Sequence, residues 1–140
     1  MIEWIEDKQD DLFEKKSGSG LDYAEDDLKF ARHGLTLGEK APFRLVAYHA
    51  QQCAEKALKA FLVYHREDFP FTHNISILLE LCEKSADWPT RLQEAEMLTS
   101  YAISVRYPGI DESVTFQQAR AAILLAQKVK EKVNASLSGI

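Results

Sequence analysis

The sequence predicts an all-α protein: an antiparallel up-and-down bundle of four main helices, with one short helix and one N-terminal helix. Apolar residues recur three or four positions apart along most of the 140 residues, as they do in amphipathic helices. No stretch alternates apolar and polar residues with the period of two that is typical of strands. Proline and glycine fall between the periodic segments, where they end one helix and begin the next. Short connections of this kind favour antiparallel neighbours.

Length and charge limit the classes of protein that fit. A chain of 140 residues fits one domain, and it contains no apolar run near the roughly 20 residues that span a bilayer. We therefore expect no association with a membrane. The net charge of −5, with the acidic excess in residues 3–27, argues against broad binding to a phosphate backbone. This net charge is compatible with one local basic pocket.

The first residues and the cysteines favour a cytoplasmic protein. The start MIEWIEDKQDD lacks the basic and apolar regions of a signal peptide. Cys53 and Cys82 both lie in helical patterns, so we expect two buried thiols in a reducing compartment. Neither has a cysteine or histidine at metal-ligand spacing, and His49 and His65 would lie about 24 Å apart along one helix. We expect no metal and no cofactor.

The N-terminal helix is expected to be an appendage, residues 1–17, joined by a flexible Ser/Gly linker, residues 18–20, to a domain over residues 21–140. Its apolar residues, spaced for one face, are Ile2, Ile5, Leu12 and Phe13. The run from Ser17 to Gly20 has the composition of a flexible linker. The appendage would then lie on the main body or on a second subunit, and a disordered end is the alternative.

Two main helices are predicted over residues 21–37 and 42–66. The second begins near Pro42 and must end before Pro70. Its apolar side faces away from a polar stripe at helical spacing, which comprises Gln52, Glu55, Lys56 and Lys59. The stripe is either a solvated face with weak intrahelical pairs or a set of side chains that reach a common ligand.

The remaining helices are a short one over residues 75–82 and two longer ones over residues 89–105 and 116–137. Thr72 or Asn74 can cap the short helix. Thr115 with Gln118 three residues later is a capping box for the last helix.

Two loops carry candidate binding residues. His73 precedes a helix start, where it would be neutral and could contact an anion, or could only stabilise its own turn. The segment Arg106-Tyr107-Pro108-Gly109 ends a helix. Arg106 offers a guanidinium for phosphate and Tyr107 a ring for base stacking, or they cap the helix and fill the core.

The chain from about Leu21 to Leu137 resembles the HEPN family, the "higher eukaryotes and prokaryotes nucleotide-binding" domain. The segments that carry this resemblance occur in a matching order and spacing: Asp26-Asp27-Leu28 with Ala31, Gln52-x-x-Glu55-Lys56-x-x-Lys59-Ala60, Thr72-His73-Asn74, Arg106-Tyr107-Pro108, and Ala119 to Val129. The resemblance implies an α-helical bundle, frequently a homodimer, and frequently encoded beside a minimal nucleotidyltransferase as a toxin and antitoxin pair.

Many members of that family are metal-independent ribonucleases in which a histidine follows an arginine by four to six residues. Arg106 is present here, but residues 107–140 contain no histidine. The chain is therefore more similar to the branch with Arg-Tyr-Pro, for which nucleotide or RNA binding is implied.

Three functions follow from these observations, and whether the protein is an enzyme stays open among them. The first is a nucleotide- or RNA-binding module without efficient catalysis, in which Arg106 and Lys59 hold phosphate, Tyr107 stacks on the base and His73 donates or accepts a hydrogen bond. The second is a ribonuclease toxin that uses Arg106 with His73. The third is a dimeric scaffold whose polar stripe contacts a nucleotidyltransferase.

Overall fold

The computed structural model describes residues 2–86, 88, 90–106 and 113–138, with side chains except for residues 2–11, 90, 91 and 103–106. The described residues form helices and contain no strand, which confirms the all-α prediction. The elements in chain order are α1 (Ile2–Leu35), the 3₁₀-helix η1 (Gly38–Lys40), α2 (Phe43–Tyr64), α3 (Ile75–Glu83), the 3₁₀-helix η2 (Thr90–Leu98), α4 (Thr99–Arg106) and α5 (Phe116–Ser138). No helix of these described residues is long and apolar enough to cross a membrane.

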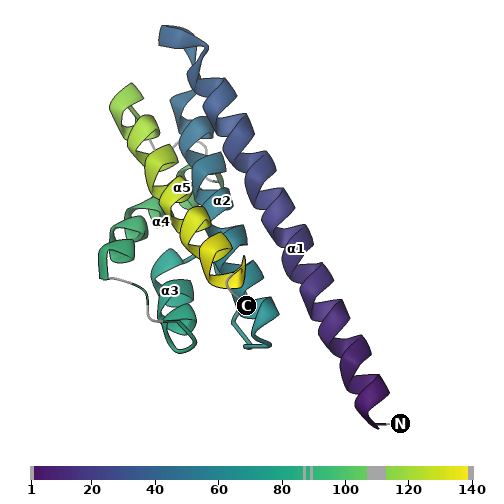
Figure 1. Cartoon of the computed structure of the whole chain (residues 1–140). Coiled ribbons are helices and arrows are strands. Elements are labelled where there is room, and N and C mark those ends of the chain that lie inside the picture. Colours follow the sequence, from purple (N-terminus) through teal and green to yellow (C-terminus); the bar gives the residue numbers. More distant parts are fainter. Residues whose placement is uncertain (1, 87, 89, 107–112, 139–140) are drawn as a thin grey trace.

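Helix α2 is the centre of the bundle, with α1 along one side and α5 along another (Figure 1). Helix α1 runs antiparallel to α2, since Ser17 lies against Ala60 and Gly34 lies against Val46. Helix α5 runs in the same direction as α2, with Phe116 at its start packed on Phe43 at a ring distance of 6.0 Å. Every helix that packs on α2 thereby covers part of its apolar surface.

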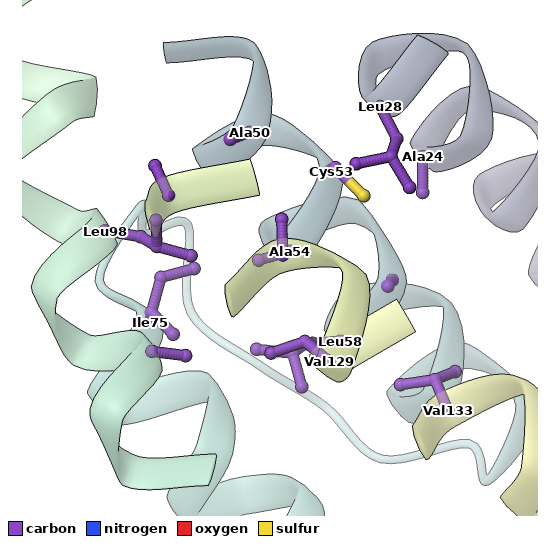
Figure 2. Packing of buried hydrophobic residues seen from close by; sticks show 14 of the residues in the cluster. Ala24, Leu28, Ala50, Cys53, Ala54, Leu58, Ile75, Leu98, Val129 and Val133 are labelled. Atoms are coloured by element: carbon purple, nitrogen blue, oxygen red, sulfur yellow. The ribbon is translucent and has the colours of Figure 1, made fainter. Parts of the chain in front are cut away.

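The core lies between α2 and its neighbours, and Figure 2 shows α1, α2, α5 and the 75–98 region meeting there. The labelled side chains in that view are Ala24, Leu28, Ala50, Cys53, Ala54, Leu58, Ile75, Leu98, Val129 and Val133. Both cysteines are buried, as predicted. Burial raises the pKa of the Cys53 thiol to about 12, and it also raises the pKa of the Cys82 thiol.

The predicted break in the helix at Ser17 to Gly20 is wrong, because α1 continues through these residues. The small residues allow α1 to approach α2 closely. The Ser17 hydroxyl donates to the carbonyl of Ala60 at 2.8 Å, and a Cβ on Gly20 would lie 3.1 Å from the Cβ of Ala60. The composition that indicated a linker reflects a tight helix contact instead. The division into an appendage of residues 1–17 and a domain of residues 21–140 stays a prediction.

The helix predicted over residues 89–105 consists of two elements, η2 and α4. The buried side chains of η2 are Leu92, Ala95 and Leu98, spaced three apart. A 3₁₀-helix has three residues per turn, so this spacing places all three on one side. The next buried residue is Ala102, four positions after Leu98, which matches the α-helical turn of α4.

Two predicted helix caps are confirmed. Asn74 accepts from the backbone N–H of Ile77 at 3.3 Å at the start of α3. At the start of α5, the backbone N–H of Gln118 donates to Thr115 Oγ1, and the backbone N–H of Thr115 donates to Gln118 Oε1. These caps fix where α3 and α5 begin, and the first of them positions the segment that carries His73.

Candidate binding site on the central helix

A buried carboxylate organises the polar side of α2. Glu55 is only 4% exposed, and its Oε1 accepts from Gln51 Nε2 at 3.0 Å and contacts His73 Nδ1 at 2.7 Å. Its second oxygen, Oε2, accepts from Lys59 Nζ at 3.2 Å. We call Gln51, Gln52, Glu55, Lys59 and His73 the Glu55 cluster.

Gln51 closes the inner end of the Glu55 cluster. It is fully buried, and its Nε2 also reaches the backbone carbonyl of His73 at 3.4 Å. Its Oε1 accepts from Gln52 Nε2 at 2.7 Å. A buried charge is tolerated only when it is paired and hydrogen-bonded, and the Glu55 carboxylate has both kinds of partner. Glu55 is therefore not part of a solvated face, which was the alternative reading of the stripe.

Aromatic side chains adjoin the outer edge of the Glu55 cluster. Lys59 Nζ lies 5.9 Å from the ring centroids of both Phe69 and Phe71. Phe71 is 90% exposed, and its ring meets the His73 ring edge to face at 5.6 Å. An ammonium and an exposed ring thus lie side by side at the surface of the 69–74 connection.

The second ring nitrogen of His73 is an exception to this pattern of satisfied polar atoms. His73 Nε2 is buried and has no hydrogen-bond partner among the residues that the structure describes. A buried polar atom without a partner costs about 1–3 kcal/mol. The ring is held through Nδ1 by Glu55 and contacts Phe71, so a further donor or acceptor at Nε2 would stabilise the cluster.

A second carboxylate, from α1, binds the neighbouring part of α2. Asp27 Oδ1 contacts His49 Nδ1 at 2.9 Å, and Asp27 Oδ2 accepts from Lys56 Nζ at 2.6 Å. We call these three residues the Asp27 cluster. The ring of Phe30, which is 60% exposed, lies on the His49 ring at 4.6 Å.

The structure brings together four of the predicted site residues, Gln52, Glu55, Lys59 and His73. Lys56 belongs to the Asp27 cluster instead. The backbone of Arg106 ends α4, while its side chain and all of Tyr107 lie outside what the structure describes.

Sequence reasoning missed five residues of this surface as members of the site: Gln51, Asp27, His49, Phe30 and Phe71. The sequence could have indicated Gln51, since it stands four positions before Glu55 on the same helix. Spacing in the sequence could not indicate the contact between Asp27 and His49, because they lie on two different helices. In the described part of the chain, no group of three or more histidine, cysteine, aspartate or glutamate side chains is placed to hold a metal ion.

The fold and this cluster define a class of protein, an all-α bundle with a buried polar network on its central helix. The family model for the HEPN domain matches residues 20–136, and the chain belongs to the HEPN family. It is thus a module of the nucleotide-binding or ribonuclease type.

Two solved structures are similar to this chain. TT1696 from Thermus thermophilus has a TM-score of 0.74 and 31% identity, over 86% of this chain and 97% of that one. ST0689, described as an archaeal HEPN homologue, has a TM-score of 0.69 and 25% identity, over the same shares of the two chains. A comparison with curated proteins finds no match.

Proposed function

We propose that this protein binds a nucleotide or an RNA strand at the outer edge of the Glu55 cluster, without efficient cleavage. The observation that carries the proposal is that one buried carboxylate holds Lys59 and His73 beside the exposed ring of Phe71. Rigid side chains held by a buried network are suited to binding, because little conformational entropy is lost when the ligand arrives.

The chemistry of these groups fits a nucleotide. An ammonium has three N–H donors, and Glu55 takes one from Lys59, so the others can donate to a phosphate. An exposed ring such as Phe71 is a surface on which a base can stack, worth about 1–3 kcal/mol per base. The positive charge of Lys59 and the ring of Phe71 can therefore bind the phosphate and the base of one nucleotide.

Arg106 is the further phosphate ligand that we propose. The backbone N–H of Ile75, two residues after His73, donates to the hydroxyl of Thr99 at the start of α4. Arg106 ends the same helix, about 10 Å along its axis from Thr99. A guanidinium reaches far from its backbone and binds phosphate with two parallel hydrogen bonds. Tyr107, the next residue, is the proposed second stacking ring.

The proposal assigns binding rather than efficient cleavage because a suitable general acid and base are lacking. No histidine follows Arg106 in the sequence. His73 is the remaining candidate, but its Nδ1 contacts Glu55 and its Nε2 is buried. A general base must come within hydrogen-bond reach of the proton that it removes. The ribonuclease toxin that uses Arg106 with His73 is the competing function.

The test is binding and cleavage of a labelled RNA by the pure protein in the presence of a chelator. Arg106→Ala should weaken binding by about 1.5–3 kcal/mol, and Arg106→Lys should recover only part of this, since an ammonium lacks the planar fork. Lys59→Met should also weaken binding, whereas Lys84→Met, at an exposed position after α3, is the matched control.

The outcomes separate the three functions. Cleavage that survives the chelator and vanishes in His73→Ala would establish the ribonuclease. Binding that neither Arg106→Ala nor Lys59→Met weakens would refute the proposed site and favour the scaffold.

We further propose that the protein is a cytoplasmic homodimer and the partner of a minimal nucleotidyltransferase. Helix α1 extends beyond the end of α2, as Figure 1 shows, and Leu12 on this extension is 49% exposed. Apolar surface that one bundle leaves uncovered is suited to a second copy. Light scattering that finds a monomer at micromolar concentration would refute the dimer.

A further inference from the structure

The polar surface of α2 carries the same arrangement of side chains twice. In each cluster a carboxylate binds one lysine of α2 and the Nδ1 atom of one histidine: Asp27 binds Lys56 at 2.6 Å and His49 at 2.9 Å, and Glu55 binds Lys59 at 3.2 Å and His73 at 2.7 Å. In each, the histidine ring also contacts an exposed phenylalanine, Phe30 for the Asp27 cluster and Phe71 for the Glu55 cluster.

The α2 members of the two clusters alternate along one face of the helix. His49, Gln52, Lys56 and Lys59 are spaced three, four and three residues apart, which places them on one helix face, and all four are partly exposed. From His49 to Lys59 the helix rises about 15 Å. Consecutive stacked nucleotides of one strand advance about 3.4 Å each, so this face has the length of about four nucleotides.

We propose that the ligand of this protein is a single-stranded RNA that follows α2 from Lys59 to His49, with Phe71 and Phe30 stacking bases at its two ends. This inference rests on the proposed function and specifies its ligand as a strand rather than a mononucleotide. Lys56 would donate to a phosphate with the N–H groups that Asp27 does not use.

The arrangement also accounts for two features that a mononucleotide site leaves unexplained. Phe30 is 60% exposed although its ring contacts the His49 ring, so part of the ring is open to a base. Asp27 is only 9% exposed, and it holds both His49 and Lys56 at the side of α2 that faces α1. Paired ammonium groups bind phosphate weakly, so the affinity should depend on several contacts and should fall only modestly as salt rises.

The test is a length series of oligoadenylates, with one, two, four and eight nucleotides, titrated against the wild-type protein and four variants. We expect the wild-type affinity to rise with length up to about four nucleotides and then to level off. Phe30→Leu should weaken the tetranucleotide by about tenfold and leave AMP within twofold, since Phe30 lies at the far end beside His49. Lys56→Gln should also weaken the tetranucleotide by about tenfold. Lys59→Met should weaken every length.

Phe116→Leu is the control for the loss of an exposed ring, since Phe116 is 41% exposed on α5 and packs on Phe43. It should not change binding. Circular dichroism and light scattering accompany each variant. If Lys56→Gln does not fold, Phe30→Leu alone tests the proposed strand, because an exposed ring contributes little to the stability of the core.

The failures of the two proposals are distinguishable. If AMP and the longer oligomers bind with equal affinity, or if Phe30→Leu and Lys56→Gln leave the tetranucleotide unaffected, the strand is refuted and the nucleotide site stands. If Phe30→Leu changes the oligomeric state, the exposed ring belongs to a subunit interface and the strand is refuted. If neither AMP nor any of the oligoadenylates binds, both proposals are refuted.

Discussion

The two clusters on α2 use the same chemistry but differ in what holds them together. The Glu55 side chain is 6% exposed, and its partners come from α2 itself and from the connection that follows it. The Asp27 side chain is 12% exposed and lies on α1, while both of its partners lie on α2. The first cluster therefore depends on burial and on the hydrogen bonds that both carboxylate oxygens of Glu55 accept. The second depends on where α1 lies against α2.

Truncation of the two carboxylates gives the largest expected difference between the clusters. Glu55→Ala should lower the free energy of unfolding by about 3 kcal/mol, because it removes the anion that Lys59 and His73 share and one hydrogen-bond partner of the buried Gln51. Asp27→Ala should cost only about 1 kcal/mol, because Lys56 is 38% exposed and can turn to water. Urea unfolding measures both.

Glu55→Gln is the companion variant for this comparison, since it keeps the shape and removes the charge. The free energy of unfolding of Glu55→Gln should lie between the values for wild type and Glu55→Ala. Equal losses for Glu55→Ala and Asp27→Ala would show that burial does not distinguish the clusters.

A change at the contact between α1 and α2 should break one cluster and spare the other. Gly20→Leu would force the helices apart, because even a Cβ there lies 3.1 Å from Ala60, and overpacking costs about 1–3 kcal/mol. The imidazole resonance of His49 should shift as Asp27 withdraws, while the resonance of His73 should stay. Proton NMR of the histidine side chains measures both.

Gly18→Leu is the matched control, since a Cβ on Gly18 meets nothing within 4 Å. This variant should gain about 0.5–1 kcal/mol, because glycine is a poor helix former. A shift of both histidines in Gly20→Leu would mean that α1 supports the Glu55 cluster as well.

The sequence best predicted the features that depend on residues close together in one helix. The periodicity of α2 and α5, the Asn74 cap and the Thr115 capping box depend on neighbours in the chain, and all were predicted. The stripe that contains Glu55 and Lys59 was found for the same reason. Its burial was not, because the 69–74 connection that covers it folds back from a distance.

The features that the sequence did not reveal depend on contacts between helices. Asp27 meets His49 and Lys56 across two helices, at separations of 22 and 29 residues, so spacing in the chain cannot indicate the contact. The run at Ser17 to Gly20 has the composition of a linker, and only the position of Ala60 on α2 shows why small residues stand there. Local composition cannot separate a flexible linker from a close helix contact.

The smallest expected effect concerns the opposite side of α1, where Glu25 faces α5. Glu25 Oε2 accepts from Lys130 Nζ at 2.7 Å, and this bond holds the pKa of the Glu25 carboxyl below its usual value of 4.5. A carboxyl with a lowered pKa in the folded state stabilises the protein fully above its unfolded pKa, and this contribution is lost as the pH falls through the folded pKa. Glu25→Gln should therefore cost about 0.3–0.5 kcal/mol at pH 7, the range for a pair near the surface, and progressively less below pH 4.5.

Urea unfolding of wild type and Glu25→Gln from pH 7 to pH 3 measures this effect, with Glu39→Gln at the exposed η1 as the control. The position of Glu25 makes the variant useful for the comparison of the clusters. It lies two residues before Asp27 on α1 but binds α5, so its removal loosens the α1–α5 contact and leaves the Asp27 contacts to α2 in place. The His49 resonance should then be unchanged at pH 7. A cost that stays constant down to pH 3 would show that the loss comes from packing rather than from the charge of Glu25, and a shift of His49 would show that α5 helps to hold α1 against α2.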